Sequence, residues 1–93
     1  MKRIVDGLLY DTKKAELLCK WKSNYDYVNC VLWHNYLYRT SSGRYFLYMR
    51  GMRSGYKSSE IIRPLTDDEA CIKLAEHNPN KAFLFFPDKI KEA

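Results

Sequence analysis

The chain has 93 residues, which is enough for one hydrophobic core and too few for a second, so we expect a single domain, residues 1–93. Hydrophobic residues make up 46% of the sequence and charged residues 29%, a balance that excludes an intrinsically disordered chain. The net charge of +5 favours an anionic partner, either nucleic acid or an acidic protein surface, although charge of this size also serves solubility alone.

The first predicted element is a small hairpin over residues 2–10. Apolar residues flank Asp6-Gly7, a dipeptide suited to the positive φ angles of a tight hairpin turn. Asp11 or Thr12 is then expected to cap a short helical turn. No apolar stretch of signal-peptide length occurs near the start, and no run approaches the roughly 18 residues of a transmembrane helix.

Residues 15–22 are expected to form a half-buried strand. Apolar and polar residues alternate there with a period close to two, with Leu17, Cys19 and Trp21 on the apolar side. A helix over residues 12–22 is the competing interpretation. Residues 23–29 contain Ser, Asn and Asp and are expected to form a loop.

The strongest pattern is an aromatic-rich hairpin within residues 32–50. Ser41-Ser42-Gly43 separates the runs 33–40 and 44–49, and a three-residue loop ending in Gly fits a type I turn followed by a glycine bulge. A two-residue loop would exchange the two faces. The three-residue register pairs Thr40 with Arg44, Tyr38 with Phe46 and Tyr36 with Tyr48 on one face, and Arg39 with Tyr45, Leu37 with Leu47 and Asn35 with Met49 on the other.

The next segment is expected to be a loop and a short strand. Residues 51–60 contain two Gly and three Ser, and this predicted loop carries Arg53 and Lys57. Residues 61–65 follow as a strand, which should lie at a sheet edge or end at Pro64, because proline has no N–H to donate.

The last third of the chain is expected to be helical. Thr66-Asp67-Asp68-Glu69 forms a capping box, so the main helix begins there and runs to about residue 77. Its apolar stripe consists of Ala70, Cys71, Leu74 and Ala75. Asn78-Pro79 ends this helix and begins a second short one over residues 79–86, whose apolar run is expected to pack on the sheet.

Together these elements predict an α+β fold. It consists of an antiparallel sheet of four to five strands with one main helix, about 66–77, packed on one face.

Candidate chemistry is sparse along the chain. His34 falls in a predicted strand and His77 at a helix end, so neither is placed beside a nucleophile, and no Cys or His residues stand at metal-ligand spacing. We therefore expect no catalytic residues, no metal and no cofactor, and hence no enzyme. Three cysteines without a CxxC pair indicate a reducing compartment, the cytoplasm.

Aromatic and basic residues interleave over 22 positions, 36–57. Tyr and Arg are favoured at binding hot spots, and aromatic rings beside cations also stack on single-stranded nucleic acid. The plain alternative is that these tyrosines fill the core and form cross-strand pairs. The partner-binding residues predicted from this pattern are Arg39, Arg44, Arg50, Arg53, Tyr56 and Lys57.

Three spaced blocks carry a family resemblance over residues 4–77. They are Tyr10-Asp11-Thr12-x-x-Ala15-Glu16-Leu17, then Leu37-Tyr38-Arg39-Thr40-x-x-Gly43-x-x-Phe46-Leu47-Tyr48, then Ile61-Ile62-x-Pro64-Leu65-Thr66-x-x-Glu69-Ala70. The sequence resembles small proteins carried on prophages and other mobile elements of Gram-positive bacteria, some of which are anti-CRISPR proteins. It departs from them in a shorter Gly- and Ser-rich loop and in a tail, residues 81–93, of mixed charge.

The resemblance implies a function for a bacterial host cell. The leading hypothesis is a non-enzymatic inhibitor that binds a CRISPR effector protein or ribonucleoprotein, of the Cas9 type, and blocks it by occlusion. The alternative is a small basic nucleic-acid-binding or regulatory protein of a mobile element. A structural subunit or an enzyme is a third possibility, and no membrane partner is expected. A dimer formed through an exposed sheet edge is left open.

Overall fold

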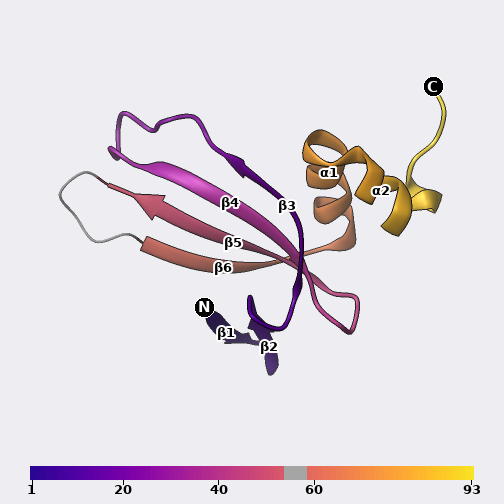
Figure 1. Cartoon of the computed structure of the whole chain (residues 1–93), viewed down its shortest axis with the longest axis horizontal. Helices are drawn as coiled ribbons and strands as arrows, with labels where there is room; N and C mark the ends of the chain where they lie inside the picture. The colour runs from indigo at the N-terminus through magenta and orange to yellow at the C-terminus, as the bar shows by residue number, and fades with distance from the viewer. Residues whose placement is uncertain (54–58) are drawn as a thin grey trace.

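The computed structural model of the protein describes residues 1–53 and 59–93. Within them, six strands and two α-helices follow in the order β1 (Lys2–Val5), β2 (Leu8–Asp11), β3 (Glu16–Lys22), β4 (Leu32–Arg39), β5 (Tyr45–Met52), β6 (Ser59–Leu65), α1 (Asp67–His77) and α2 (Pro79–Phe85), and one 3-10 turn follows at Pro87–Lys89. The strands form two antiparallel sheets, a hairpin of β1 and β2 and a four-stranded meander β3-β4-β5-β6 (Figure 1). The predicted α+β fold is confirmed.

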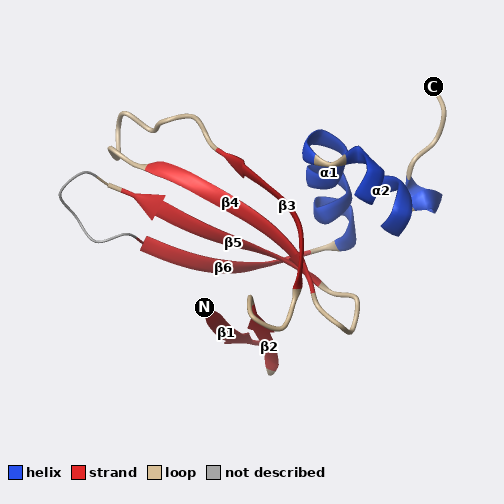
Figure 2. Ribbon diagram, viewed as in Figure 1, coloured by secondary structure: helices blue, strands red, loops and turns tan. Residues whose placement is uncertain are grey.

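Two layers cover opposite faces of the four-stranded sheet. The helices lie on one side of it, and the β1–β2 hairpin lies on the other, beside β6 (Figure 2). Both layers lie toward the end of the sheet at which β4 turns into β5, so the opposite end extends beyond them.

The central hairpin has the predicted three-residue register. Tyr38 pairs with Phe46 and Leu37 with Leu47, as the spacing required. Gly43 closes the turn with a φ of +85°, a conformation that glycine adopts without steric cost. The backbone N–H of Thr40 donates to the carbonyl of Arg44 at 2.8 Å, which completes the ladder.

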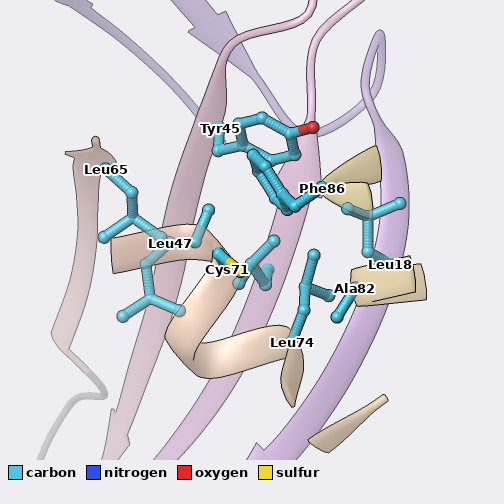
Figure 3. Close-up of a cluster of buried hydrophobic side chains, with 10 residues drawn as sticks. Leu18, Tyr45, Leu47, Leu65, Cys71, Leu74, Ala82 and Phe86 are labelled. Atoms are coloured by element: carbon cyan, nitrogen blue, oxygen red, sulfur yellow. The ribbon is translucent and has the colours of Figure 1, made fainter. Parts of the chain in front are cut away.

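The main core lies between the helices and the sheet (Figure 3). Leu37 and Leu47 point into it from the two central strands, and Leu74 meets them from α1. The apolar run of the second short helix contributes only in part: Ala82 and Phe86 are buried here, whereas Phe83 and Leu84 are exposed. The cluster comprises Leu18, Leu37, Tyr45, Leu47, Leu65, Ala70, Cys71, Leu74, Ala82 and Phe86.

The capping box at the start of α1 is confirmed. The backbone N–H of Glu69 donates to the Thr66 hydroxyl at 3.1 Å, and the N–H of Thr66 donates to the Glu69 carboxylate at 3.0 Å. The predicted apolar stripe is correct at Ala70, Cys71 and Leu74 but wrong at Ala75, which is exposed. At 3.6 residues per turn, Ala75 lies about 90° around the helix from the centre of the buried stripe.

A second, smaller core lies under the β1–β2 hairpin. The Tyr10 ring of β2 meets the edge of the Phe46 ring with centroids 5.5 Å apart, and Ile62 completes the fully buried group. The guanidinium of Arg3 donates to the carbonyl of Ile62 at 2.7 Å and ties the hairpin to β6. The turn at Asp6-Gly7 has positive φ at both residues, as predicted.

Residues 16–22 form the predicted strand, and the helical alternative is wrong. The pairing of β3 with β4 contains a bulge between Leu17 and Cys19. The bulge places Leu18 in the core at 4% exposure, while Leu17 is 43% exposed. The simple alternation therefore assigned these two leucines to the wrong sides. The Asn78 amide donates to the carbonyl of Leu18 at 2.9 Å and holds the bulge against the end of α1.

Two local predictions differ from the structure. Asp11 accepts from the N–H of Lys13, but the segment is a hydrogen-bonded turn and not a helical one. The strands β5 and β6 run past their predicted ends, to Met52 and back to Ser59. Gly51 belongs to β5 through its pairing with Trp33, whose ring lies over it, 2.9 Å from where a Cβ would stand.

The edge position of β6 agrees with the sequence argument from Pro64, since β6 is the last strand of the sheet. Tyr56 and Lys57 of the predicted loop lie outside the described residues.

The bulge predicts opposite costs for two adjacent leucines. Leu18→Ala should lower the free energy of unfolding by about 2 to 5 kcal/mol, because it removes buried methyl groups and leaves a cavity. Leu17→Ala should cost less than about 1 kcal/mol, since this residue is exposed and belongs to neither core. Urea denaturation of both variants measures the difference, and equal costs would contradict the bulged register.

The capping box predicts a pH-dependent contribution to stability. Backbone and side-chain hydrogen bonds with Thr66 hold the pKa of Glu69 below its ordinary value of 4.5. A lowered folded-state pKa contributes stability above the ordinary value, and this contribution disappears as the pH falls through the folded-state pKa. Wild type should therefore exceed Glu69→Gln in stability at pH 7 by more than at pH 3.5. Urea denaturation at both pH values tests this, and a pH-independent difference would exclude a role for the Glu69 charge.

Candidate binding surface on the open sheet face

The face of the sheet opposite the helices is only partly covered. Phe46 and Ile62 of this face lie beneath the β1–β2 hairpin. Beyond them, side chains from β3, β4 and β5 remain exposed or half-buried in two cross-strand rows. We call this set the open sheet face; it consists of Lys20, Lys22, His34, Tyr36, Tyr48 and Arg50.

The strand pairing fixes the order within each row. Lys20 of β3 stands next to Tyr36 of β4, which stands next to Tyr48 of β5. The neighbouring row runs from Lys22 through His34 to Arg50, and Glu60 of β6 continues it at the edge. The rows are two residues apart along each strand, about 7 Å. The open sheet face therefore places an aromatic pair beside a mainly cationic row.

Tyr36 and Tyr48 form the aromatic centre of this surface. Their ring centroids are 5.6 Å apart, and the ring planes are tilted by 32°. The Tyr48 hydroxyl donates to the Glu60 carboxylate at 2.9 Å. Burial, followed by this hydrogen bond, raises the pKa of Tyr48 to about 12, so the phenol stays neutral at physiological pH. The hydrogen bond also fixes the direction of the ring.

A shallow hollow of about 250 Å³ lies between β3 and β4 on this surface. Lys20, Lys22, His34 and Tyr36 line it, together with Trp21 and Asn35. The side chains of these last two residues alternate to the helix side, where Trp21 stacks on His77 and Asn35 donates to Ser23. Their backbone therefore forms the floor, and the rim is basic and aromatic.

The cations of the open sheet face are free of ion pairs within the described part of the chain. The ion pair found there joins Lys89 to Asp68 on the helical side, where the Nε2 of His77 also lies 3.6 Å from the carboxylate of Glu76. Three cations, from Lys20, Lys22 and Arg50, stand against the single carboxylate of Glu60. The surface therefore carries a net positive charge that is available to an anionic partner.

The structure separates the arginines of the predicted patch. Arg39 lies on the helix side, where its guanidinium is 4.7 Å from the centroid of the Phe85 ring and its Nε is buried without a hydrogen-bond partner among the described residues. Arg44 is exposed at the β4–β5 turn. It lies six residues, or about 20 Å, from Arg50 along the strand.

Arg50 and Arg53 are the members that the structure brings to the same end of the sheet. Arg53 follows β5 and is exposed. Its charge contributes to lowering the pKa of Asp26, after the hydrogen bonds from Asn29 and Val28, so it lies near the β3–β4 connection. Tyr56 and Lys57 lie outside the described residues.

The sequence-based patch omitted five residues of the open sheet face. The hairpin register correctly placed Tyr36 and Tyr48 on one face. Lys20 and Lys22 stood on the polar side of the strand predicted over residues 15–22. The sequence does not show that β3 pairs with β4, and this pairing is what brings the lysines onto the same face as the tyrosines. His34 was identified only as a candidate base and not as a neighbour of Arg50.

Groups suited to catalysis are scattered over the described residues. No three His, Cys, Asp or Glu side chains gather there in a way that could hold a metal ion. Burial raises the pKa of the Cys19 thiol to about 11, so it is protonated at neutral pH and a poor nucleophile. Within 1–53 and 59–93, no helix is long and apolar enough to span a membrane.

Comparisons of the chain with family models, with curated proteins and with solved structures found no match.

Proposed function

We propose that the protein is a non-enzymatic inhibitor that binds a CRISPR effector of the Cas9 type in the bacterial cytoplasm and blocks it by occlusion. The family resemblance supports the class of target. The observation that supports binding by a surface is the open sheet face, where a tyrosine pair stands among unpaired cations. Tyrosine and arginine are the residue types in which binding energy concentrates at interfaces.

The sign of the charge decides between two modes of occlusion. Effectors of this type hold their guide–target duplex in a positively charged channel. An inhibitor that imitates DNA in that channel must be acidic, whereas this chain carries a net charge of +5. The protein therefore acts on an anionic part of the loaded effector, either its guide RNA or an acidic protein surface.

The open sheet face is the centre of the proposed contact and not all of it. A specific interface buries about 800 Å² on each partner. Four strands about 4.8 Å apart give a surface only about 15 Å across. The neighbouring β3–β4 connection extends this surface, since it exposes Tyr27 and Val28 at the same end of the sheet.

A second candidate function is regulation of a mobile element by direct binding to its nucleic acid. The unpaired cations of the open sheet face favour it, because lysine and arginine neutralise phosphates. Under this function the partner is lost when nucleic acid is digested.

Charge reversal tests the proposed site. The variant with Arg50→Glu and Arg53→Glu should weaken inhibition of target cleavage roughly tenfold or more, since hot-spot residues cost more than about 1 kcal/mol each. Arg44→Glu reverses one charge about 20 Å away and should inhibit like wild type, whereas Arg50→Glu alone, with the same change of charge, should already weaken inhibition. Cleavage by a purified, guide-loaded effector is measured against inhibitor concentration.

The cleavage assay and a pull-down together distinguish an error in the proposed site from an error in the proposed function. Full inhibition by the double variant would show that the site is elsewhere. An absence of binding to every effector in a pull-down would overturn the inhibitor proposal, and partners lost after nuclease treatment would support the regulatory function.

A further inference from the structure

The two rows of the open sheet face differ in chemistry in a way that matches a nucleic acid strand. One row contains two neighbouring aromatic rings, and the next contains two cations and an imidazole. Nucleotides likewise alternate a flat aromatic base with an anionic phosphate, and proteins that bind single strands pair a cationic track with rings on which bases stack.

We propose that the open sheet face binds single-stranded nucleic acid, with bases stacked on Tyr36 and Tyr48 and phosphates against Lys20, Lys22 and Arg50. This inference deepens the proposed function, because it names the part of a loaded effector that the same face recognises. The inference rests on the proposed function only for the identity of the nucleic acid in the cell, since binding to a single strand can be measured without an effector.

The aromatic pair meets the first requirement of such a site. Both rings are half-buried, so the sheet holds them while part of each remains in solvent. They are tilted by 32° and so do not lie flat on one another. The Tyr48 ring is anchored by the hydrogen bond to Glu60, so binding a base costs little additional side-chain ordering.

The cations meet the second requirement. Lys20 of β3 stands next to Tyr36 across the sheet, Arg50 lies two residues from Tyr48 along β5, and Lys22 borders the hollow beside His34. The nearby carboxylate of Glu60 accepts a hydrogen bond from the Tyr48 hydroxyl, so part of its hydrogen-bonding capacity is used within the protein. A phosphate chain that runs beside the aromatic pair therefore meets Lys20 next to Tyr36, and Arg50 in the neighbouring row beside Tyr48.

The position of the helices, on the opposite side of the sheet, favours a single strand over a duplex on this surface. The major groove of DNA is read by an inserted helix or a two-stranded ribbon. On the open sheet face the aromatic groups lie within a four-stranded surface, and the helices lie on the opposite side. Bases inside a duplex already stack on each other, so only an unpaired strand has base faces to offer.

A comparable physical arrangement is known in RNA-binding modules that use the open face of a four-stranded sheet with helices behind it. The strand order differs here, because this sheet is a simple meander, β3-β4-β5-β6. The comparison therefore concerns the geometry of stacking and implies no common ancestry.

Fluorescence anisotropy with labelled 12-nucleotide uridine and thymidine oligomers tests the inference. Wild type should bind these strands at low salt at least tenfold more tightly than a hairpin duplex of the same charge. Three phosphate contacts predict a slope of about −2 in a plot of log K against log salt concentration. Lys20→Gln with Lys22→Gln should make that slope shallower by about 1.4.

Aromatic variants separate stacking from charge. Tyr36→Ala should weaken binding about 5- to 150-fold, the range for loss of one stacked base. Tyr36→Phe keeps the ring and should bind within about twofold of wild type. Phe83→Ala removes an aromatic ring that is 60% exposed on α2, on the helical side of the sheet, so it should leave the affinity unchanged.

Specific outcomes would overturn the inference. Equal affinity for the single strand and the duplex, or unchanged binding by Tyr36→Ala, would exclude a stacking site. Effector inhibition without oligonucleotide binding would assign the face to a protein contact and would leave the proposed function intact. Oligonucleotide binding without effector inhibition would support the site and overturn the proposed function.

Discussion

The alternation of side chains along β4 and β5 is the constraint on which both the core and the binding surface depend. Leu37 and Leu47 point toward the helices, so their neighbours Tyr36 and Tyr48 must point the other way. A shift of one residue would place the tyrosines under α1 and the leucines in solvent. Gly43 closes the three-residue turn that the observed pairing of β4 with β5 requires. This turn therefore sets the strand register, and with it which side chains lie on the open sheet face.

Because the sheet is covered unevenly, the residues that stabilise the fold and the cations proposed to bind a partner lie in different places. The helices and the β1–β2 hairpin pack over the same end, where Leu37 and Phe46 are fully buried on opposite faces. The cations of the open sheet face, Lys20, Lys22 and Arg50, lie outside both cores. Substitutions of these cations therefore change charge without removing buried area, which makes the surface free to vary while the fold is kept.

Local sequence patterns predicted the elements whose causes are local. The turn at Gly43 and the capping box at Thr66 depend on residues within four positions, and both were read correctly. The bulge at Leu18 could not be predicted, because it depends on a contact with Asn78, sixty residues away. The candidate site shows the same limit: Arg39 and Arg50 look equivalent in the sequence, but Arg39 packs on Phe85 from a distant helix.

The uncovered end of the sheet gives the molecule a gradient of local stability. Backbone hydrogen bonds near Lys22 and Gly51 are protected by the strand ladder, whereas those near Leu37 also lie beneath packed layers. Amide hydrogens at the open end should therefore exchange with solvent through small openings that leave both cores intact. These small openings would let the outer strands, β3 and β6, adjust their twist to an irregular partner. A bound partner would then slow amide hydrogen exchange at this end of the sheet alone.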